Sequence, residues 1–321
     1  MNILLLGAGG QLGRALAAAL PALGTLTALD RSQANLADLD ALPGVMRRHR
    51  PDLLVNAAAY TAVDRAEREP QAAQRVNAEA VAVLAAEARR AGALLLHYST
   101  DYVFDGAKPA PYVESDAAHP LNAYGRSKLA GERAVLDSGC RALVLRLSWV
   151  YSADPQARNF VNAVLAQACT RDTLDMVADQ VGAPTSAARI AAVSAQAAQA
   201  CLAGRLAPGL YHLSAAGSVD RHTLARHIVA RALRNGWPLR LRPEGIAAVP
   251  TPAASAAGED RLPPVPASHA PRPLNSRLDG TALSRALGLA LPDWREDLDA
   301  MLDARRPPQA QPLATGRPKN G

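Results

Sequence analysis

Short apolar runs alternate with amphipathic stretches along the first half of the chain. Runs of this length and composition are typical of strands buried on both faces of a sheet. The strands expected from them are residues 2–7, 26–29, 52–55, 93–98 and 142–147. Alanine- and leucine-rich stretches between the runs, such as residues 14–20 and 72–91, predict helices. The alternation therefore predicts an α/β fold with a Rossmann-like, doubly wound parallel sheet and right-handed crossovers.

After about residue 150 the alternation becomes less regular, which indicates a second, smaller α/β unit. Helices are expected at about residues 159–170, 187–202, 221–235 and 291–302, and strands at 175–177 and 209–213. Residues 250–273 are rich in proline and alanine without periodicity, so we expect a long loop there. The polar tail, residues 305–321, is expected to be mobile.

Composition and charge restrict the classes of function. A chain of 321 residues with 49% hydrophobic residues can bury a large core. Its net charge of +6 suits an anionic ligand such as a nucleotide or a sugar phosphate. Nucleic acid is the competing ligand, but the arginines are scattered and no nucleic-acid-binding motif is present, so we expect none. No apolar run approaches the length of a membrane span, and the apolar N-terminus lacks the basic start of a signal peptide.

Three widely separated cysteines, Cys140, Cys169 and Cys201, indicate a reducing compartment. Their odd number makes a disulfide framework improbable, and no Cys/His spacing is typical of a zinc site. We therefore expect a cytoplasmic protein without a structural metal.

A glycine-rich turn follows the first expected strand and begins the first expected helix. Gly7, Gly10 and Gly13 would let the backbone turn tightly and approach a pyrophosphate at the helix N-terminus. Asp30 and Arg31 follow the second strand. The carboxylate could bind ribose hydroxyls and the guanidinium a 2′-phosphate, so the choice between NADH and NADPH stays open. A turn or capping role is the alternative for Asp30.

Tyr124 and Lys128 are four residues apart in an expected helix, so their side chains would leave the same face. An ammonium beside a phenol favours the phenolate, and we expect Lys128 to lower the pKa of Tyr124 toward the working pH of an acid–base catalyst. The alternative is a surface lysine over a half-buried ring.

Polar and aromatic residues follow two neighbouring strands. Thr100, Asp101 and Tyr102 come after strand 93–98, and Trp149 follows strand 142–147. Because ligands bind at the carboxyl ends of parallel strands, these residues are candidates for binding. A strand-end hydroxyl and core aromatic rings are the alternatives. His97 lies within an apolar strand and is expected to be a core histidine.

Seven sequence blocks appear together in an order that resembles the dTDP-4-dehydrorhamnose reductases, a family of extended short-chain dehydrogenases/reductases. The blocks lie at residues 7–13, 56–64, 99–106, 120–128, 148–151, 179–185 and 275–278. The resemblance covers most of residues 1–300.

The resemblance implies that NADPH, or NADH as the alternative donor, reduces the C4 ketone of dTDP-4-dehydro-β-L-rhamnose. The product, dTDP-L-rhamnose, is a precursor of cell-surface polysaccharide. Residues 1–150, with a returning segment near 184–204, would bind NADP(H), and residues 151–183 and 205–302 would bind the sugar nucleotide.

The family pattern also implies roles for individual residues. Tyr124 would protonate the ketone oxygen, Thr100 would hydrogen-bond it, and Lys128 would hold the nicotinamide ribose. Cofactor binding is implied for Gly7, Gly10, Gln11, Leu12, Gly13, Asp30, Arg31, Ala57, Ala58, Ala59, Tyr124 and Lys128. Substrate binding is implied for Thr61, Val63, Thr100, Asp101, Tyr102 and Trp149.

The chain departs from the family in one respect that concerns assembly. Some members dimerise through a magnesium ion held by acidic residues after the glycine turn and after the Gly-Ala-Pro-Thr block. Here residues 13–16 and 186–193 contain no carboxylate. Without hard oxygen ligands we expect no magnesium site, and a monomer or a metal-free homodimer. Two alternatives for function are a reductase of another nucleotide-linked 4-ketosugar and a non-catalytic NADP-binding regulatory subunit.

Overall fold

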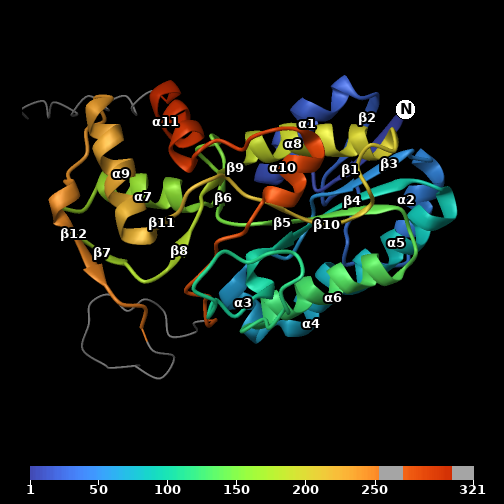
Figure 1. Ribbon diagram of the computed structural model, residues 1–321, viewed down its shortest axis with the longest axis horizontal. Helices are drawn as coiled ribbons and strands as arrows, with labels where there is room; N and C mark the ends of the chain where they lie inside the picture. The colour runs from blue at the N-terminus through green and yellow to red at the C-terminus, as the bar shows by residue number, and fades with distance from the viewer. Residues whose placement is uncertain (253–269, 306–321) are drawn as a thin grey trace, which may run out of the picture.

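The structure is a computed structural model that describes residues 1–252 and 270–305 (Figure 1). Most of the expected loop at 250–273 and all but the first residue of the expected tail at 305–321 lie outside the described residues.

Six parallel strands form the main sheet, in the order β10-β5-β4-β3-β1-β2. The strands are β1 (Asn2–Leu6), β2 (Thr25–Leu29), β3 (Leu53–Asn56), β4 (Leu94–Thr100), β5 (Ala142–Leu147) and β10 (Gly209–Leu213). Successive strands are added on both sides of β1, as in a doubly wound sheet. The expected α/β fold with a parallel central sheet is confirmed.

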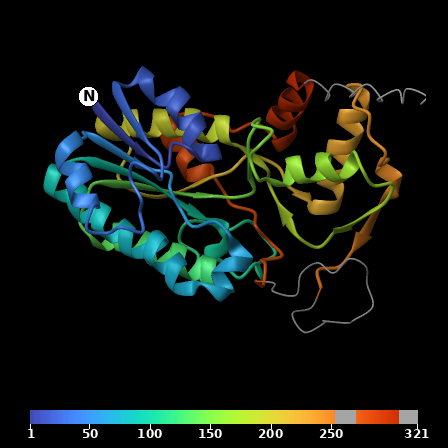
Figure 2. The same ribbon diagram turned by 180° about the vertical axis from the view of Figure 1, so that it is seen from behind.

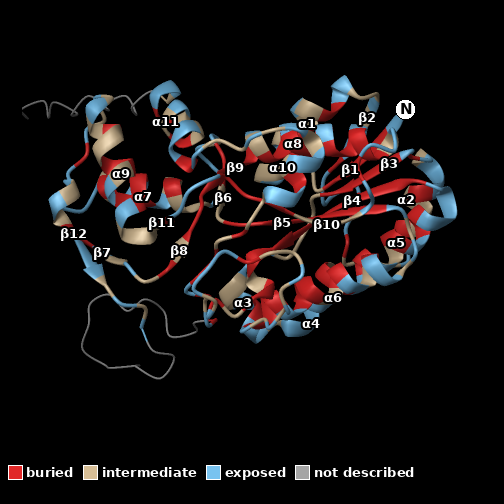
Figure 3. Cartoon of the chain, in the orientation of Figure 1, coloured by how far each residue is buried: buried red, intermediate tan, exposed pale blue. Residues whose placement is uncertain are grey.

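Helices cover both faces of this sheet, and its central strands β1, β3, β4 and β5 are buried at nearly every position (Figure 3). On one face Ile3 and Leu5 pack toward α1 (Gln11–Ala19), α8 (Ala187–Leu202) and α10 (Thr281–Leu287). On the other face Leu4 and Leu6 share a core with α2 (Leu42–His49) and α5 (Ala80–Ala91). The helix α6 (Ala123–Asp137) packs beside α5.

A smaller unit lies beyond the carboxyl ends of the strands (Figure 2). It contains α7 (Phe160–Ala168), α9 (Arg221–Arg234), α11 (Trp294–Ala304) and the parallel pair β7 (Leu174–Val177) and β12 (Ile246–Val249). Its own core includes Leu165, Leu224, Ile228 and the fully buried Trp294. The segment 205–302 was expected to belong to the substrate-binding unit. Two of its elements, β10 and α10, instead pack on the large sheet.

Two short strand pairs connect the units. They are β6 (Val150–Tyr151) with β9 (Thr185–Ser186), and β8 (Val181–Gly182) with β11 (Val219–Asp220).

The helix expected over residues 72–91 consists of consecutive segments. After α3 (Val63–Arg68), α4 (Pro70–Gln74) continues as a π-helix over Arg75–Glu79 and then as α5. In the π-helix the Asn77 side chain accepts from the Tyr60 N–H (2.8 Å) and donates to the Tyr60 carbonyl (3.0 Å) and to Ser127 Oγ (2.9 Å). A single buried amide therefore joins the loop after β3 to α6. Three 3₁₀ turns complete the described elements: Leu20–Ala22, Asp101–Val103 and Pro243–Gly245.

A buried ion pair fastens α6 to β5. Arg146 Nε donates to Glu132 Oε2 at 2.9 Å, and a second bond joins the same two side chains. Both residues are almost fully buried, at 3% and 2% exposure, and the guanidinium also lies over the Phe104 ring. His97 behaves as the expected core histidine: it is buried, and its Nδ1 lies 3.3 Å from Asn56 Nδ2.

Candidate active site

The carboxyl end of β4 meets the first turn of α6. Thr100 ends β4; its Oγ1 accepts from the Tyr102 N–H at 3.2 Å and donates to Asp101 Oδ1 at 3.1 Å. Asn122 caps α6 by accepting from the Gly125 N–H at 2.7 Å. At Gly125 a Cβ would lie 2.2 Å from the Tyr102 carbonyl oxygen, so glycine permits the close approach that brings Tyr124 to Thr100.

Tyr124 and Lys128 lie on one buried face of α6, as expected from their spacing. Burial raises the pKa of the Tyr124 phenol, and a hydrogen bond with Thr100 offsets part of this rise. Burial lowers the pKa of Lys128 to about 8, and its Nζ donates to the Tyr98 carbonyl at 2.6 Å. The expected lowering of the Tyr124 pKa by Lys128 is therefore wrong for this structure, because burial outweighs every other influence on the phenol.

Tyr102 links this centre to the segment that follows the undescribed residues 253–269. Its ring meets the Tyr124 ring edge-on, with 5.6 Å between centroids. Its hydroxyl accepts from Arg272 at 2.9 Å, and Arg272 also makes a two-pronged ion pair with Asp64 at 2.8 and 2.9 Å. The carbonyl of Pro271 accepts from Asn122. Residues 270–272 therefore form a clasp that joins α3, α6 and Tyr102.

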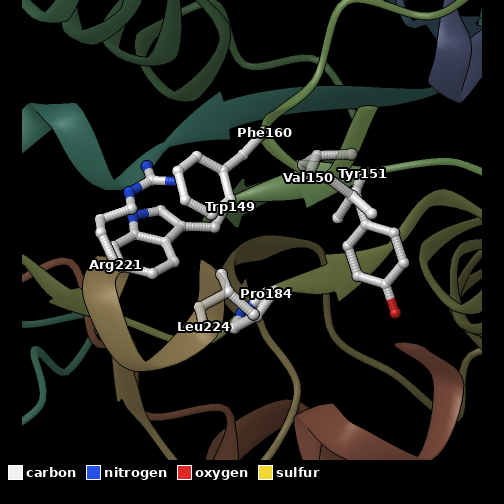
Figure 4. A pocket seen from close by; sticks show the side chains of 8 residues that line it. Trp149, Val150, Tyr151, Phe160, Pro184, Arg221 and Leu224 are labelled. Atoms are coloured by element: carbon white, nitrogen blue, oxygen red, sulfur yellow. The ribbon is translucent and has the colours of Figure 1, made fainter. Parts of the chain in front are cut away.

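A cavity of about 150 Å³ opens beside Trp149 (Figure 4). The centre of the Arg221 guanidinium lies 3.6 Å from the centroid of the Trp149 ring and 4.6 Å from that of Phe160. Among the described residues, the Arg221 side chain has no hydrogen-bonding or ion-pair partner, and burial lowers its pKa to about 10. The other lining residues are Val150, Tyr151, Val161, Pro184 and Leu224. A cation held between aromatic faces without a carboxylate suits an anionic ligand that carries a ring.

The backbone of Trp149 is in the left-handed region, with φ 45°. Such a conformation is costly for a bulky residue and is found most often at functional sites. The ring lies against Gly182, where a Cβ would be 2.5 Å from Trp149 Cε2. Gly182 therefore makes room for the aromatic wall of the cavity.

Gly182→Ala is expected to lower the free energy of unfolding by about 1–3 kcal/mol, because the added methyl group overpacks the site and displaces the Trp149 ring. Urea denaturation and the tryptophan emission spectrum measure the two effects. Gly44→Ala is the matched control, since nothing lies within 4 Å of a Cβ at that position. Equal stability of the Gly182→Ala variant and the wild type would contradict the packing argument.

The glycine turn forms a cradle at the N-terminus of α1. Gly7 has φ 81°, and a Cβ on Gly13 would lie 2.0 Å from the Gly7 carbonyl oxygen. Gly10 caps α1 without a side-chain hydrogen bond, so backbone amides there remain available for an anion. The Ala58 backbone closes the turn, because a Cβ on Gly7 would lie 2.6 Å from its nitrogen. The cradle fits a pyrophosphate group.

The remaining predicted residues are distributed around this cradle and the Tyr124 centre. Gln11 begins α1, and its amide donates to the Val150 carbonyl at 3.4 Å, next to Trp149. Val63 packs with Tyr124, whereas Thr61 is exposed in the loop before α3. Asp30 Oδ1 accepts from the N–H and hydroxyl of Ser32, so this carboxylate has the turn role that was its alternative. Leu12, Ala57 and Ala59 are half-buried, and Arg31 is exposed.

Sequence reasoning did not find three residues of the site: Arg221, Arg272 and Phe160. Arg221 follows the N-cap of α9 and Phe160 follows the N-cap of α7, so the two capping signals are visible in the sequence. Arg272 lies three residues before the sequence block 275–278 that resembles the reductase family, and this proximity was the only sequence feature that pointed to Arg272.

Across residues 1–252 and 270–305, no group of three or more His, Cys, Asp or Glu side chains is placed to hold a metal ion. In the same part of the chain no helix combines the length and apolar character needed to cross a membrane.

Comparison with known proteins adds independent information. The family model described as the RmlD substrate binding domain matches residues 1–306. The dTDP-4-dehydrorhamnose reductase of Burkholderia thailandensis is 44% identical over 301 residues, which are 92% of this chain and 96% of that protein. The enzyme of the same name from Salmonella typhimurium is 42% identical over 306 residues, 94% of this chain and 97% of that protein.

Solved structures of proteins with the same name have a similar fold. The dTDP-4-dehydrorhamnose reductase of Bacillus anthracis in complex with NADP has a TM-score of 0.79 at 29% identity, covering 94% of this chain and 96% of that one. The Clostridium acetobutylicum orthologue has a TM-score of 0.81 at 28% identity, with 94% and 99% coverage. UDP-glucose 4-epimerase from Brucella ovis, at 18% identity and a TM-score of 0.73, shares the fold.

Proposed function

The chain belongs to the family of the RmlD substrate binding domain, and on that premise we propose that it reduces the C4 ketone of dTDP-4-dehydro-β-L-rhamnose to dTDP-L-rhamnose with NADPH. The observation that carries the proposal is that Thr100 meets Tyr124 at the carboxyl end of β4, on the same edge of the parallel sheet at which the glycine cradle follows β1 and the Arg221 cavity follows β5. Gln11 of the cradle contacts Val150 of the cavity wall, so the two binding regions adjoin.

In the proposed reaction, bound NADPH supplies the hydride that reduces the ketone. Tyr124 donates its phenolic proton to the C4 oxygen as negative charge develops there. The raised pKa keeps this phenol protonated at neutral pH, and an alkoxide is still more basic than a phenolate. Thr100 Oγ1 orients the same oxygen.

The surrounding residues have proposed binding roles. Lys128 would hold a ribose hydroxyl of the cofactor, since its Nζ has donor capacity beyond its bond to the Tyr98 carbonyl. Tyr102 and Trp149 would contact the sugar. Arg221 and Phe160 would take the diphosphate and the base, for which a buried cation between aromatic rings is suited.

Cofactor preference is proposed to follow Arg31. The Asp30 carboxylate is engaged by Ser32, while Arg31 is exposed beside the cradle. A guanidinium in this place suits the 2′-phosphate of NADPH, and NADH is the weaker alternative.

The proposed division of labour follows the packing. Residues 1–150, the segment near 184–204, and the elements β10 and α10 would hold the cofactor, and the unit built on α7, α9 and α11 would close on the sugar nucleotide. We place the protein in the cytoplasm, a proposal that the three free thiols support.

The proposed assembly is a monomer or a metal-free homodimer. Residues 13–16 and 186–193 carry no carboxylate for a magnesium bridge. Sedimentation velocity is therefore expected to give the same distribution with magnesium chloride and with EDTA. A magnesium-dependent change in the sedimentation coefficient would refute this proposal.

The activity is tested with purified protein, NADPH or NADH, and a panel of nucleotide-linked 4-ketosugars. We expect the fastest cofactor oxidation with dTDP-4-dehydro-β-L-rhamnose and NADPH, and dTDP-L-rhamnose as the product identified by NMR. Faster reduction of a different ketosugar would reassign the substrate. Nucleotide binding without turnover of any member of the panel would favour a regulatory subunit instead.

A further inference from the structure

Asp101 is a buried carboxyl that the mechanism above leaves without a chemical role. Only 3% of the residue is exposed, and it directly follows Thr100. Its Oδ1 accepts from Thr100, whereas its Oδ2 is buried without a hydrogen bond of ordinary geometry among the described residues, although the Ser276 hydroxyl lies near enough to lower the pKa of the carboxyl. A buried carboxylate in this condition is costly, whereas the neutral acid avoids most of that cost.

The Thr100 hydroxyl stands between this carboxyl and the Tyr124 phenol. Thr100 Oγ1 is 3.1 Å from Asp101 Oδ1, and a hydrogen bond with Thr100 acts on the pKa of Tyr124. A hydroxyl has one proton and accepts as well as donates, so it can point its proton toward either neighbour. The Asp101–Thr100 hydrogen bond and the influence of Thr100 on the phenol therefore connect the carboxyl to Tyr124 through one hydroxyl.

We propose that Asp101 is the proton reservoir that restores Tyr124 after each reduction, acting through Thr100; this inference rests on the proposed reductase activity. Once Tyr124 has given its proton to the C4 oxygen, the phenolate receives the Thr100 proton. Thr100 Oγ1 takes the Asp101 proton in the same movement. One proton leaves Asp101, one arrives at Tyr124, Thr100 is unchanged, and Asp101 regains a proton from solvent before the next turnover. Asp101 thus acts through Thr100 and is a positioning residue.

The electrostatic surroundings agree with this role. Burial raises the pKa of Asp101 to about 6. The hydroxyls of Ser276 and Thr100 and the Arg221 cation of α9 lower the pKa of this carboxyl, but burial outweighs them. Tyr124, which also faces it, remains a neutral phenol near neutral pH because burial raises the pKa of that phenol. Because the folded pKa is raised, the reservoir is filled below about pH 6 and empties as the pH rises through that value.

The decisive variant is Asp101→Asn, which keeps an acceptor for Thr100 but carries no acidic proton. Because Tyr124 begins the first turnover already protonated, we expect stopped-flow measurements to show a burst of one NADPH oxidised per site at the wild-type rate. A steady state slower by about 10²-fold should follow, at the lower end of the usual contribution of a positioned acid. The decline of kcat above about pH 6 should disappear in this variant.

Thr100 variants test the connection between the two groups. Thr100→Ser retains the hydroxyl and should retain the pH dependence of kcat, whereas Thr100→Val should abolish it. In the Thr100→Val background, Asp101→Asn should cause no further loss of steady-state turnover, because the chain is already broken.

Infrared titration gives a readout that does not depend on turnover. The wild type should show the carbonyl stretch of a protonated carboxyl that titrates near pH 6 and is absent from Asp101→Asn. A midpoint near the ordinary value of 3.8 would overturn the reservoir. Two results for Asp101→Asn would also overturn the reservoir, because they identify a substrate contact. One is a slowed first turnover, and the other is a raised KM with an unchanged pH profile. Absence of turnover in the wild type would instead overturn the proposed function, and the reservoir with it.

Discussion

Replacing Tyr124 by phenylalanine is expected to lower kcat by about 10²–10⁴-fold, the usual worth of a positioned general acid. The variant removes one oxygen atom from a ring that is 9% exposed and leaves the ring's packing against Tyr102 in place. KM should change little, because the lost interaction matters only when charge develops on the ketone oxygen. Steady-state oxidation of NADPH with the ketosugar measures both parameters.

Tyr98→Phe is the matched control. Tyr98 lies on β4, two residues before Thr100, and is also buried, but its hydroxyl donates to Ser194 of α8 at 2.9 Å, on the face of the sheet away from α6. Its loss should cost about 0.5–1.5 kcal/mol of stability and leave kcat near that of the wild type. Wild-type turnover in Tyr124→Phe, with normal substrate binding, would remove Tyr124 from the reaction.

Arg146→Met is expected to lower the free energy of unfolding by about 3–5 kcal/mol, because it leaves Glu132 buried without its cation. The double variant Arg146→Met/Glu132→Leu should recover most of the loss, since it removes both charges and keeps the volume filled. Urea denaturation followed by circular dichroism measures the free energies.

Arg240→Met is the control for this experiment. Arg240 makes a two-pronged pair with Asp172 in which both side chains are mostly exposed, and it should contribute about 1 kcal/mol or less. If Arg146→Met were no less stable than Arg240→Met, burial would not govern the strength of the Arg146–Glu132 pair.

The large sheet could be predicted from the sequence because its central strands β1, β3, β4 and β5 are buried on both faces. These central strands are mostly apolar runs, although β4 contains His97 and β5 contains Arg146. The strand β10 at Gly209–Leu213 and the helix α8 at Ala187–Leu202 have the bounds expected from their sequence patterns. The π-helix at Arg75–Glu79 could not be predicted. It depends on the fit of Asn77 between Tyr60 and Ser127, a tertiary contact without a periodic signal.

The residues of the candidate site could be predicted where they lie close together in the sequence. The residues that distant segments contribute could not be predicted. Tyr124 and Lys128 share a face because of their helical spacing, but the pKa of the phenol depends on burial that only the folded chain determines. Arg272 reaches Tyr102 across 170 positions of sequence, which no local pattern encodes.

The clasp at residues 270–272 also bears on how the molecule is made. Thr100, Tyr124 and Lys128 leave the ribosome long before Arg272, which must then reach back to Asp64 and Tyr102. The edge strand β10 likewise joins the sheet after the excursion through α7 and α8. Because the N-terminal part of a chain folds first during synthesis, the glycine cradle can form while translation continues, whereas the clasp over Tyr102 and Asp64 closes only after Arg272 has been made.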